Sequence, residues 1–130
     1  MIIRIEPESD IPIYQQMTNQ IIEGIAIGLI QPGDSLPSVR TFAADLGINM
    51  HTVNKSYHQL EKKGIIRIVP KSGAVISSPH DYNDFSFDRL KENYKLLIAE
   101  SLVVGMSNEQ IQELVSSTIN HLKNSSNKEA

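Results

Sequence analysis

Apolar residues recur every three or four positions along the first part of the chain, which is the pattern of a helix with one buried face. The stripe of this first segment consists of Tyr14, Met17, Ile21, Ile25 and Leu29. Asp10 is the expected cap of the helix, because its carboxylate can accept from free backbone N–H groups and Pro12 is tolerated in a first turn. Gly28 and the pair Pro32-Gly33 end it. Before the helix, the β-rich residues 2–5 predict a short strand.

Two shorter helices follow, separated by a tight turn. Ser38 is the expected cap of the first, and its buried face consists of Val39, Phe42, Ala43 and Leu46. Gly47 supplies the left-handed residue that stops a helix, and Asn49 can cap the next one. The buried stripe of that third helix consists of Met50, Val53, Tyr57 and Leu60. Two short helices joined by a glycine-containing turn predict a helix-turn-helix.

After Gly64 the pattern changes from the period of a helix to that of a strand. Residues 65–69 are β-branched except for Arg67, the turn-forming segment Pro70-Lys71-Ser72-Gly73 follows, and residues 74–77 resume the strand pattern. This arrangement predicts a β-hairpin. A helix-turn-helix followed directly by a hairpin is the layout of a winged helix. The expected fold class is therefore mainly α with a small β-hairpin, an N-terminal winged helix-turn-helix and a C-terminal two-helix unit.

Two more amphipathic helices lie beyond a polar stretch. Ser86 is the expected cap of the first, with Phe85 and Leu90 packed across it as a hydrophobic staple, and Gly105 ends that helix. Ser107 and Gln110 have the spacing of a capping box at the start of the second. The expected organisation is a winged-helix DNA-binding domain over residues 1–78, a linker over 79–84, a helical dimerisation unit over 85–123 and a frayed tail over 124–130.

The apolar stripes of these two helices need a surface to cover them. A unit of about fifty residues cannot bury both stripes by itself. We expect a homodimer, whose interface consists of Leu90, Tyr94, Leu97, Ile98, Ile111, Leu114, Val115, Ile119 and Leu122. The alternative is that the stripes pack back onto the N-terminal domain.

Composition removes several classes of protein. The chain has 130 residues and no cysteine, which excludes disulfides and thiolate metal sites. No apolar run approaches the length of a membrane span, and the N-terminal residues lack the basic-then-apolar layout of a signal peptide. We therefore expect a cytoplasmic protein with no membrane partner.

The charge distribution is more informative than the net charge of −3. Residues 33–73 contain six Lys and Arg against three Asp and Glu, whereas residues 79–130 contain five against eight. Phosphate contacts depend on the local field, so the basic balance of the first segment is compatible with a nucleic-acid partner.

The polar side of the third predicted helix has the side chains of a recognition helix. It consists of His51, Thr52, Lys55, Gln59 and Lys62, flanked by Asn54 and His58. Donor side chains near the start of a helix can reach base edges, and cations further along can reach phosphates. Asn54 has the amide needed for a bidentate contact with adenine. A solvated surface face is the plain alternative when this helix is considered alone.

Two neighbouring elements add basic groups. Arg40 points away from the buried face of its helix and can reach guanine or a phosphate, or else pair with Asp34 or Asp45. The wing tip Lys71-Ser72-Gly73 can lie along a DNA backbone or in a minor groove, where glycine permits close approach. Turn chemistry alone explains Gly73 but not the lysine.

Other functions have less support in the sequence. There is no glycine-rich phosphate loop and no evident catalytic grouping, so an enzyme is not expected. His51 and His58 are too far apart for a two-ligand clamp, and we expect no metal or other cofactor. A winged helix that binds protein instead of DNA is the remaining alternative. Binding that was unaffected by Arg40→Ala and Lys55→Ala would favour it.

Several segments together resemble the GntR family of bacterial transcriptional regulators. They are Pro12-Ile13-Tyr14, Ile30-Gln31-Pro32-Gly33-Asp34, Leu36-Pro37-Ser38-Val39-Arg40, Leu46-Gly47-Ile48-Asn49, Thr52-Val53-Asn54-Lys55-Ser56-Tyr57, Leu60-Glu61 and Gly64-Ile65-Ile66. Asn49, Thr52-Val53 and Lys55-Ser56-Tyr57 are most similar to the YtrA-type branch, whose C-terminal part is a short helical unit. Many members of the family have arginine where Met50 and Asn54 stand here.

The resemblance implies an operator-binding dimer, usually a repressor of genes for a transport system or of its own operon. It also implies DNA contacts at Arg40, at the opening of the third helix (49–54) and at Gly73. The candidate DNA-binding residues are Ser38, Arg40, Asn49, His51, Thr52, Asn54, Lys55, Lys71, Ser72 and Gly73. The expected partners are double-stranded operator DNA and a second copy of the chain. The sequence names no effector, although a groove between dimer halves leaves room for one.

Overall fold

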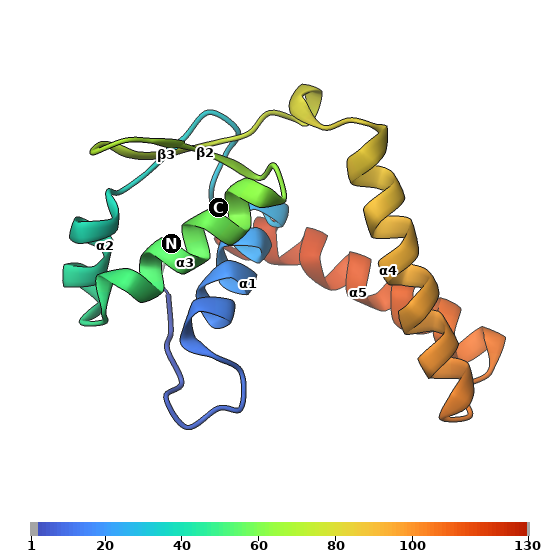
Figure 1. Ribbon diagram of the computed structural model, residues 1–130. Coiled ribbons are helices and arrows are strands. Elements are labelled where there is room, and N and C mark those ends of the chain that lie inside the picture. The colour runs from blue at the N-terminus through green and yellow to red at the C-terminus, as the bar shows by residue number, and fades with distance from the viewer. Residues whose placement is uncertain (1–2, 130) are drawn as a thin grey trace. The chain divides into compact units, whose positions relative to one another are not determined.

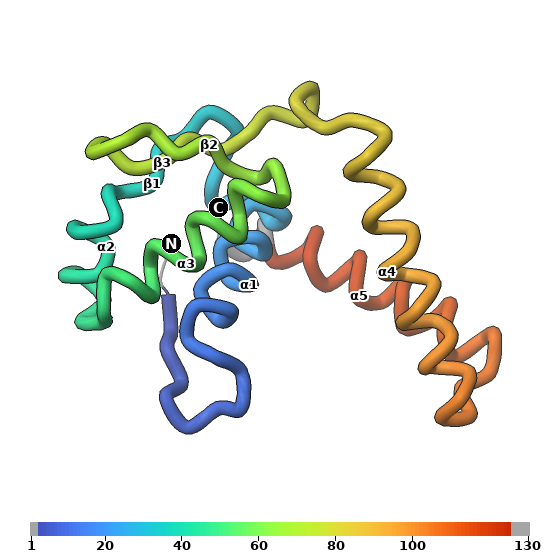
Figure 2. The backbone as a smooth tube through the Cα atoms, in the orientation of Figure 1, coloured from blue at the N-terminus to red at the C-terminus, as the bar shows by residue number. Residues whose placement is uncertain are grey.

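The computed structural model describes residues 3–129, with side chains up to residue 125 (Figures 1 and 2). The chain forms two compact units that divide between Asp81 and Tyr82. This division lies inside the polar stretch 79–84, which also contains the short 3-10 helix η1 (Pro79–Asp81). In the described part of the chain, no helix combines the length and apolar character that crossing a lipid bilayer requires.

The first unit is a winged helix. Its helices are α1 (Ile13–Ala26), α2 (Val39–Leu46) and α3 (Met50–Lys62), and its strands are β1 (Ser35–Leu36), β2 (Ile66–Val69) and β3 (Gly73–Ile76). The predicted hairpin is confirmed as β2 and β3, which pair antiparallel. Ile66 lies opposite Ile76 at one end of the pairing, and Val69 lies opposite Gly73 at the other. The structure adds the short β1, which pairs with the other edge of β3, so that the sheet order is β1-β3-β2.

The core of this unit lies where α1 and α2 pack against α3. The side chains of Met17, Ile21, Val53 and Leu60 are fully buried there. Inside this core the hydroxyl groups of Thr18 and Ser56 lie 2.9 Å apart and join α1 to α3. Because the Thr18 hydroxyl also donates to the Tyr14 carbonyl, Ser56 is the donor of the pair.

The predicted ends of the two short helices are confirmed. The Ser38 hydroxyl accepts from the Thr41 N–H at 3.2 Å, and the Asn49 side chain accepts from the His51 N–H at 2.7 Å. Gly47 between them has a φ of 68°, in the left-handed region. These local contacts fix the turn that sets the direction of α3 relative to α2.

Three expectations about the helices of this unit are wrong. Asp10 does not cap α1, because the helix begins after Pro12 and has no side-chain cap. Leu29 is not in the α1 stripe, because the helix ends at Ala26 and the chain turns at Gly28, which leaves Leu29 exposed. Met50 does not join the α3 core, since 43% of its surface is exposed.

The predicted strand at residues 2–5 is also wrong over residues 3–5, which are not in a strand, and Ile2 lies outside the described residues. Glutamine side chains of α1 bind this segment instead. The Gln20 amide accepts from the Arg4 N–H at 2.9 Å and donates to the Arg4 carbonyl at 2.7 Å. Gln16 makes the same pair of contacts with Glu6. An amide side chain has the donor and acceptor of a peptide group, so the two glutamines satisfy backbone groups that a neighbouring strand would otherwise bind.

The second unit consists of α4 (Asp84–Val103) and α5 (Asn108–Glu129). The predicted capping box is confirmed, with hydrogen bonds of 2.8 and 3.1 Å between Ser107 and Gln110. The predicted Ser86 cap is wrong. Asn83 caps α4 by accepting from the Ser86 N–H, so Phe85 lies inside the first turn and is exposed.

The expected frayed tail over residues 124–130 stays a prediction. Helix α5 continues through this segment to Glu129, and Ala130 lies outside the described residues.

Candidate nucleic-acid interface

The start of α2, the first turns of α3 and the wing surround one groove in the first unit. It has a volume of about 410 Å3 and is lined by Ser38, Val39, Arg40, Asn54, Ile68, Val69, Pro70, Lys71 and Gly73. Five of the ten predicted DNA-binding residues therefore come together here from three separate elements. Two of the lining residues are cations and none is an acid. The field in the groove thus favours a polyanion.

Arg40 lies on the exposed side of α2 and lines the groove. In the described part of the chain it forms no ion pair with Asp34 or Asp45. The Asp34 carboxylate accepts instead from the Gln31 N–H at 2.8 Å. The guanidinium of Arg40 is therefore available to a ligand, and the alternative of an internal pair is not observed.

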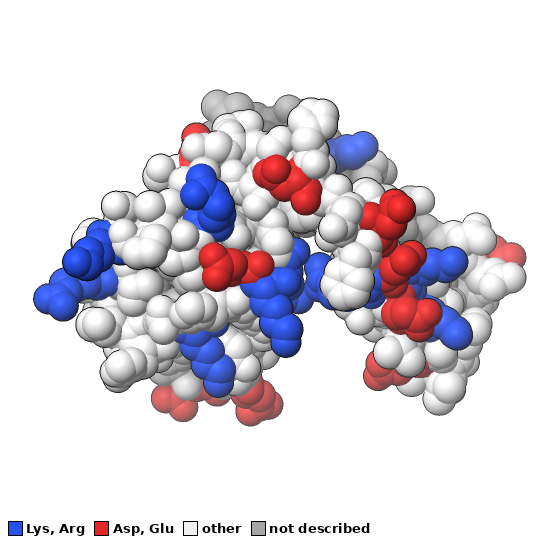
Figure 3. Space-filling view, turned by 45° about the horizontal axis from the view of Figure 1, so that its top comes forward, with Lys and Arg blue, Asp and Glu red and all other residues white. Residues whose placement is uncertain are grey.

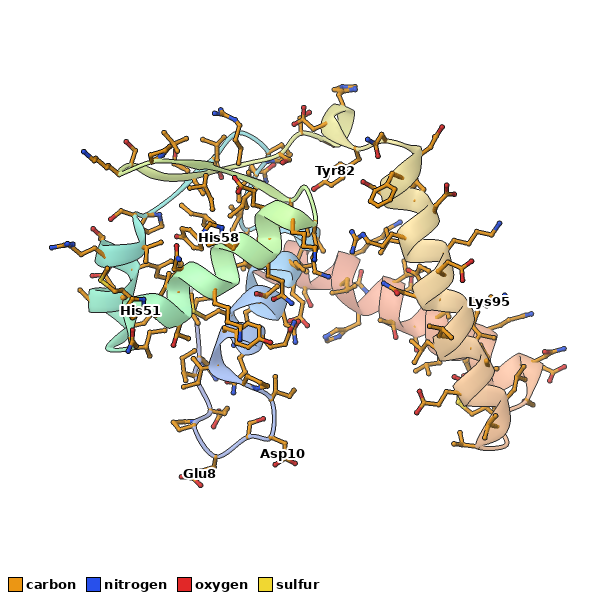
Figure 4. The ribbon with its side chains drawn as sticks, in the orientation of Figure 1. Glu8, Asp10, His51, His58, Tyr82 and Lys95 are labelled. Atoms are coloured by element: carbon orange, nitrogen blue, oxygen red, sulfur yellow. The ribbon has the colours of Figure 1, made fainter. Side chains whose placement is uncertain are left out.

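The polar side chains in the first turns of α3 differ in their exposure and in their hydrogen bonds. The side-chain oxygen of Asn49 already accepts from the His51 N–H in the cap, and its NH2 group remains free to donate. Thr52 is half-buried, whereas His51 and Asn54 are exposed. His51 and His58 project from the helix at positions two turns apart (Figure 4). The free amide of Asn54 is the group in this turn best suited to a base edge.

Part of the expected polar face of α3 is turned toward α1. The Lys55 ammonium lies 4.1 Å from the centroid of the Tyr14 ring, and Gln59 donates to the Gln15 side chain at 2.9 Å. The side-chain oxygen Oε1 of Gln59 is buried without a hydrogen-bond partner in the described structure. Gln59 thus packs in the contact between α1 and α3. The positions of polar residues along α3 alone do not reveal this contact, because they treat the helix in isolation.

The wing turn holds its residues in strained geometry. Lys71 has a φ of 68°, and the Ser72 N–H donates to the Val69 carbonyl at 3.0 Å. Basic side chains gather at the side of this unit where the hairpin turns (Figure 3, left). Lys71 and Ser72 are exposed there.

Gly73 has an internal role that the sequence did not indicate. It is buried with a φ of 117°, and a Cβ atom added to it would lie 2.1 Å from the Leu36 carbonyl oxygen. The close approach that requires glycine at this position is that of the β1 backbone. The fold alone therefore accounts for Gly73.

The buried side chain of Tyr57 holds the start of α2 in place. Its hydroxyl donates to the Pro37 carbonyl at 2.6 Å, directly before the Ser38 cap of α2. Burial raises the pKa of this hydroxyl well above its ordinary value, so the group remains a protonated donor. This contact positions the start of α2, and hence Arg40, relative to α3.

The second unit leaves its apolar residues uncovered. Ile111 and Leu122 of the predicted stripe are half-buried, and the other seven residues of that stripe are exposed. Further exposed apolar residues on α4 lie outside the predicted stripe: Phe85, Phe87, Leu96 and Val103. The apolar surface of α4 is thus wider than one helical stripe.

Comparison with known proteins identifies the family. Residues 13–76 match the family described as "Bacterial regulatory proteins, gntR family". The chain is 36% identical over 115 residues to the HTH-type transcriptional repressor YtrA of Bacillus subtilis, covering 87% of this chain and 88% of that protein. The chain belongs to the GntR family. This confirms the family expected from the sequence, and the GntR relatives are transcriptional regulators rather than enzymes, as expected.

Solved structures of similar proteins agree with this assignment over nearly the whole chain. The transcriptional antiterminator of Listeria monocytogenes EGD-e has a TM-score of 0.81 and 27% identity, over 94% of this chain and 92% of that one. The GntR-family transcription factor YtrA of Sulfolobus acidocaldarius has a TM-score of 0.63 and 39% identity, over 92% and 97%.

A third structure places a domain of this kind on DNA. It is the DNA-binding domain of AraR in complex with operator ORX1, which has a TM-score of 0.50 and 25% identity over 57% of this chain and 92% of that one. DNA-binding domains of the GntR family therefore bind operator DNA.

Proposed function

We propose that this DNA-binding transcriptional regulator of the GntR family acts as a homodimeric repressor, which binds a palindromic operator through the groove between α2, α3 and the wing. The observation that carries this proposal is the composition of the groove, which combines Arg40, Asn54 and Lys71 from three elements and contains no acid. An amide for base edges and cations for phosphates are what operator recognition requires.

Dimerisation follows from the exposed apolar residues of the second unit. The described side chains of α4 and α5 are all at least partly exposed, including large ones such as Tyr94, Leu97 and Ile119. Apolar surface of this extent is stabilised when a second surface removes it from water. A second copy of the same unit supplies that surface and adds a second winged helix, which doubles the DNA interface and matches a palindrome.

The regulatory direction rests on similarity. A relative that matches 87% of this chain, YtrA of Bacillus subtilis, is a transcriptional repressor. A dimer bound at a promoter also blocks access by simple occupancy, without any further activity. Genes of a transport system or the protein's own operon are the proposed targets, as the resemblance implies.

Fluorescence anisotropy of the purified full chain tests the proposal. The probe is a duplex from its own promoter region, compared with a scrambled duplex of equal composition, and each is titrated at several salt concentrations. We expect selective binding to the promoter duplex and a linear fall of log affinity with log salt, since phosphate contacts release counterions. Equal, weak binding to both duplexes would contradict operator recognition and favour a protein partner for the winged helix.

Light scattering on the same sample tests the dimer. A stable mass of twice the chain at micromolar concentration is expected. A monomer at that concentration would mean that the apolar residues of α4 and α5 have another role.

A further inference from the structure

Met50 differs from the other residues of its predicted stripe on α3. Val53, Tyr57 and Leu60 are fully buried, whereas 43% of the Met50 surface is exposed. Met50 is the first residue of α3, directly after the Asn49 cap. The core therefore does not explain an apolar side chain at this position, which lies at the end of the helix that faces bases in the proposed complex.

Asn54 lies one helical turn after Met50, on the same side of the helix. Residues four apart on a helix are surface neighbours, with Cβ atoms about 6 Å apart. Asn54 is exposed and lines the groove together with Arg40. Within the described residues its amide has no hydrogen-bond partner. The Asn54 amide, which has no hydrogen-bond partner in the described residues, and the exposed Met50 thioether thus lie next to each other at the start of α3.

These two side chains have complementary base chemistry. An amide can donate to N7 and accept from N6–H of adenine in a bidentate contact, and an apolar group can pack on the C5-methyl of thymine. Neither offers the paired donors with which arginine recognises guanine. The neighbouring Asn49 is less suited than Asn54 to such a contact, because its side-chain oxygen already accepts from the His51 N–H and the cap fixes the orientation of its amide.

We infer that Met50 and Asn54 together read adjacent A·T base pairs in each operator half-site. Asn54 binds the major-groove edge of an adenine, and Met50 contacts the C5-methyl of a thymine beside it. This inference rests on the proposed function and adds the base chemistry of the half-site to it. Arg40 supplies the contact to a guanine or a phosphate next to this step.

A selected duplex is the starting point of the test. The full chain is used to enrich tight binders from a pool of random duplexes, which reveals the half-site without any assumption about its sequence. Each thymine of the selected half-site is then replaced by deoxyuridine, which keeps the base pair and removes only the C5-methyl. Each adenine is replaced by 7-deazaadenine, which removes the N7 acceptor.

We expect one thymine at which deoxyuridine weakens binding by roughly threefold to fivefold, the effect of removing one buried methyl-sized contact. At an adjacent pair, 7-deazaadenine weakens binding by at least about fivefold. Met50→Ala loses the response to deoxyuridine, and Asn54→Ala loses the response to 7-deazaadenine. Leu29→Ala is the matched control, because it truncates another exposed apolar residue outside the groove and keeps both responses.

The possible outcomes distinguish a failure of this inference from a failure of the proposed operator binding. Tight binding to a selected duplex that responds to neither base analogue, or responses that persist in Met50→Ala and Asn54→Ala, would overturn the A·T reading alone. A pool from which no sequence is enriched would overturn operator recognition itself, and the inference with it.

Discussion

The Lys55 ammonium lies 4.1 Å from the centroid of the Tyr14 ring, which joins the recognition helix α3 to the start of α1. The face of an aromatic ring attracts a cation at this distance. Lys55 remains exposed in this position, so its charge is held in place and is still accessible to a phosphate. The contact thus orders a side chain of the proposed DNA interface before DNA arrives.

This relationship predicts an energetic coupling between the two residues. In a double-mutant cycle of Tyr14→Leu and Lys55→Ala, we expect a coupling of about 0.5–1 kcal/mol in the free energy of unfolding by urea. Tyr14→Phe retains the aromatic ring and should therefore keep most of this coupling energy. Strictly additive effects of the two substitutions would show that the contact does not contribute to stability.

Gly73→Ala should destabilise the first unit by roughly 3 kcal/mol or more, because a Cβ atom would overlap the Leu36 carbonyl and φ is positive. Gly64→Ala is the control. It also has a positive φ but meets no atom within 4 Å, so its cost should be nearer 1 kcal/mol. Urea unfolding of the two variants measures the difference. Equal costs would mean that backbone conformation, and not the approach of β1, requires glycine at position 73.

Tyr57→Phe should lower the free energy of unfolding by about 1–2 kcal/mol at neutral pH, since the Pro37 carbonyl loses its donor. Burial raises the pKa of the Tyr57 hydroxyl in the folded state, while the unfolded chain ionises near pH 10. The unfolded state therefore binds fewer protons above that pH, and stability falls as pH rises further. Tyr57→Phe should show a shallower fall between pH 9 and about 11. Tyr94→Phe, at an exposed ring, should fall like the unmodified chain.

Lys71→Ala should weaken binding to every duplex by a similar factor and reduce the slope of log affinity against log salt by about one. The physical reason is that Lys71 is exposed in the wing turn and lines the groove. In the proposed complex a lysine there contacts the sugar-phosphate backbone rather than base edges. The measurement is anisotropy with the promoter and scrambled duplexes over a salt series. A loss restricted to one base sequence would assign Lys71 to base recognition instead.

The parts of the fold that the sequence predicted are those determined by local interactions. The Ser38 and Asn49 caps, the Gly47 turn and the Ser107–Gln110 box each involve residues within a few positions of one another. The residue types and the backbone conformations they favour are sufficient to predict these local features. The hairpin was predictable for the same reason.

Two errors, the Asp10 and Ser86 caps, misplace a helix start by a few residues. The other errors arise where contacts between segments distant in the sequence determine the structure. β1 has only two residues and exists because β3 pairs with it, so no period in the sequence indicates it. Met50 has the spacing of a core residue, but it lies at the end of α3 beyond the helices that bury Val53. Gln59 has the polarity of a surface residue, and α1 covers it. In the site, sequence patterns found Arg40, Asn54 and Lys71 but not the groove that joins them.

The central claim, that this groove binds the operator, is tested most directly by comparing two arginine variants. Arg40 lines the groove, whereas Arg67 is an exposed arginine on β2 that lines a different cavity. Arg40→Ala should weaken operator binding by about tenfold or more, as expected for the loss of a direct contact. Arg67→Ala removes the same charge and should change affinity by less than about threefold, because salt screens a distant charge. Equal losses in both variants, or tight operator binding that survives Arg40→Ala, would contradict the claim.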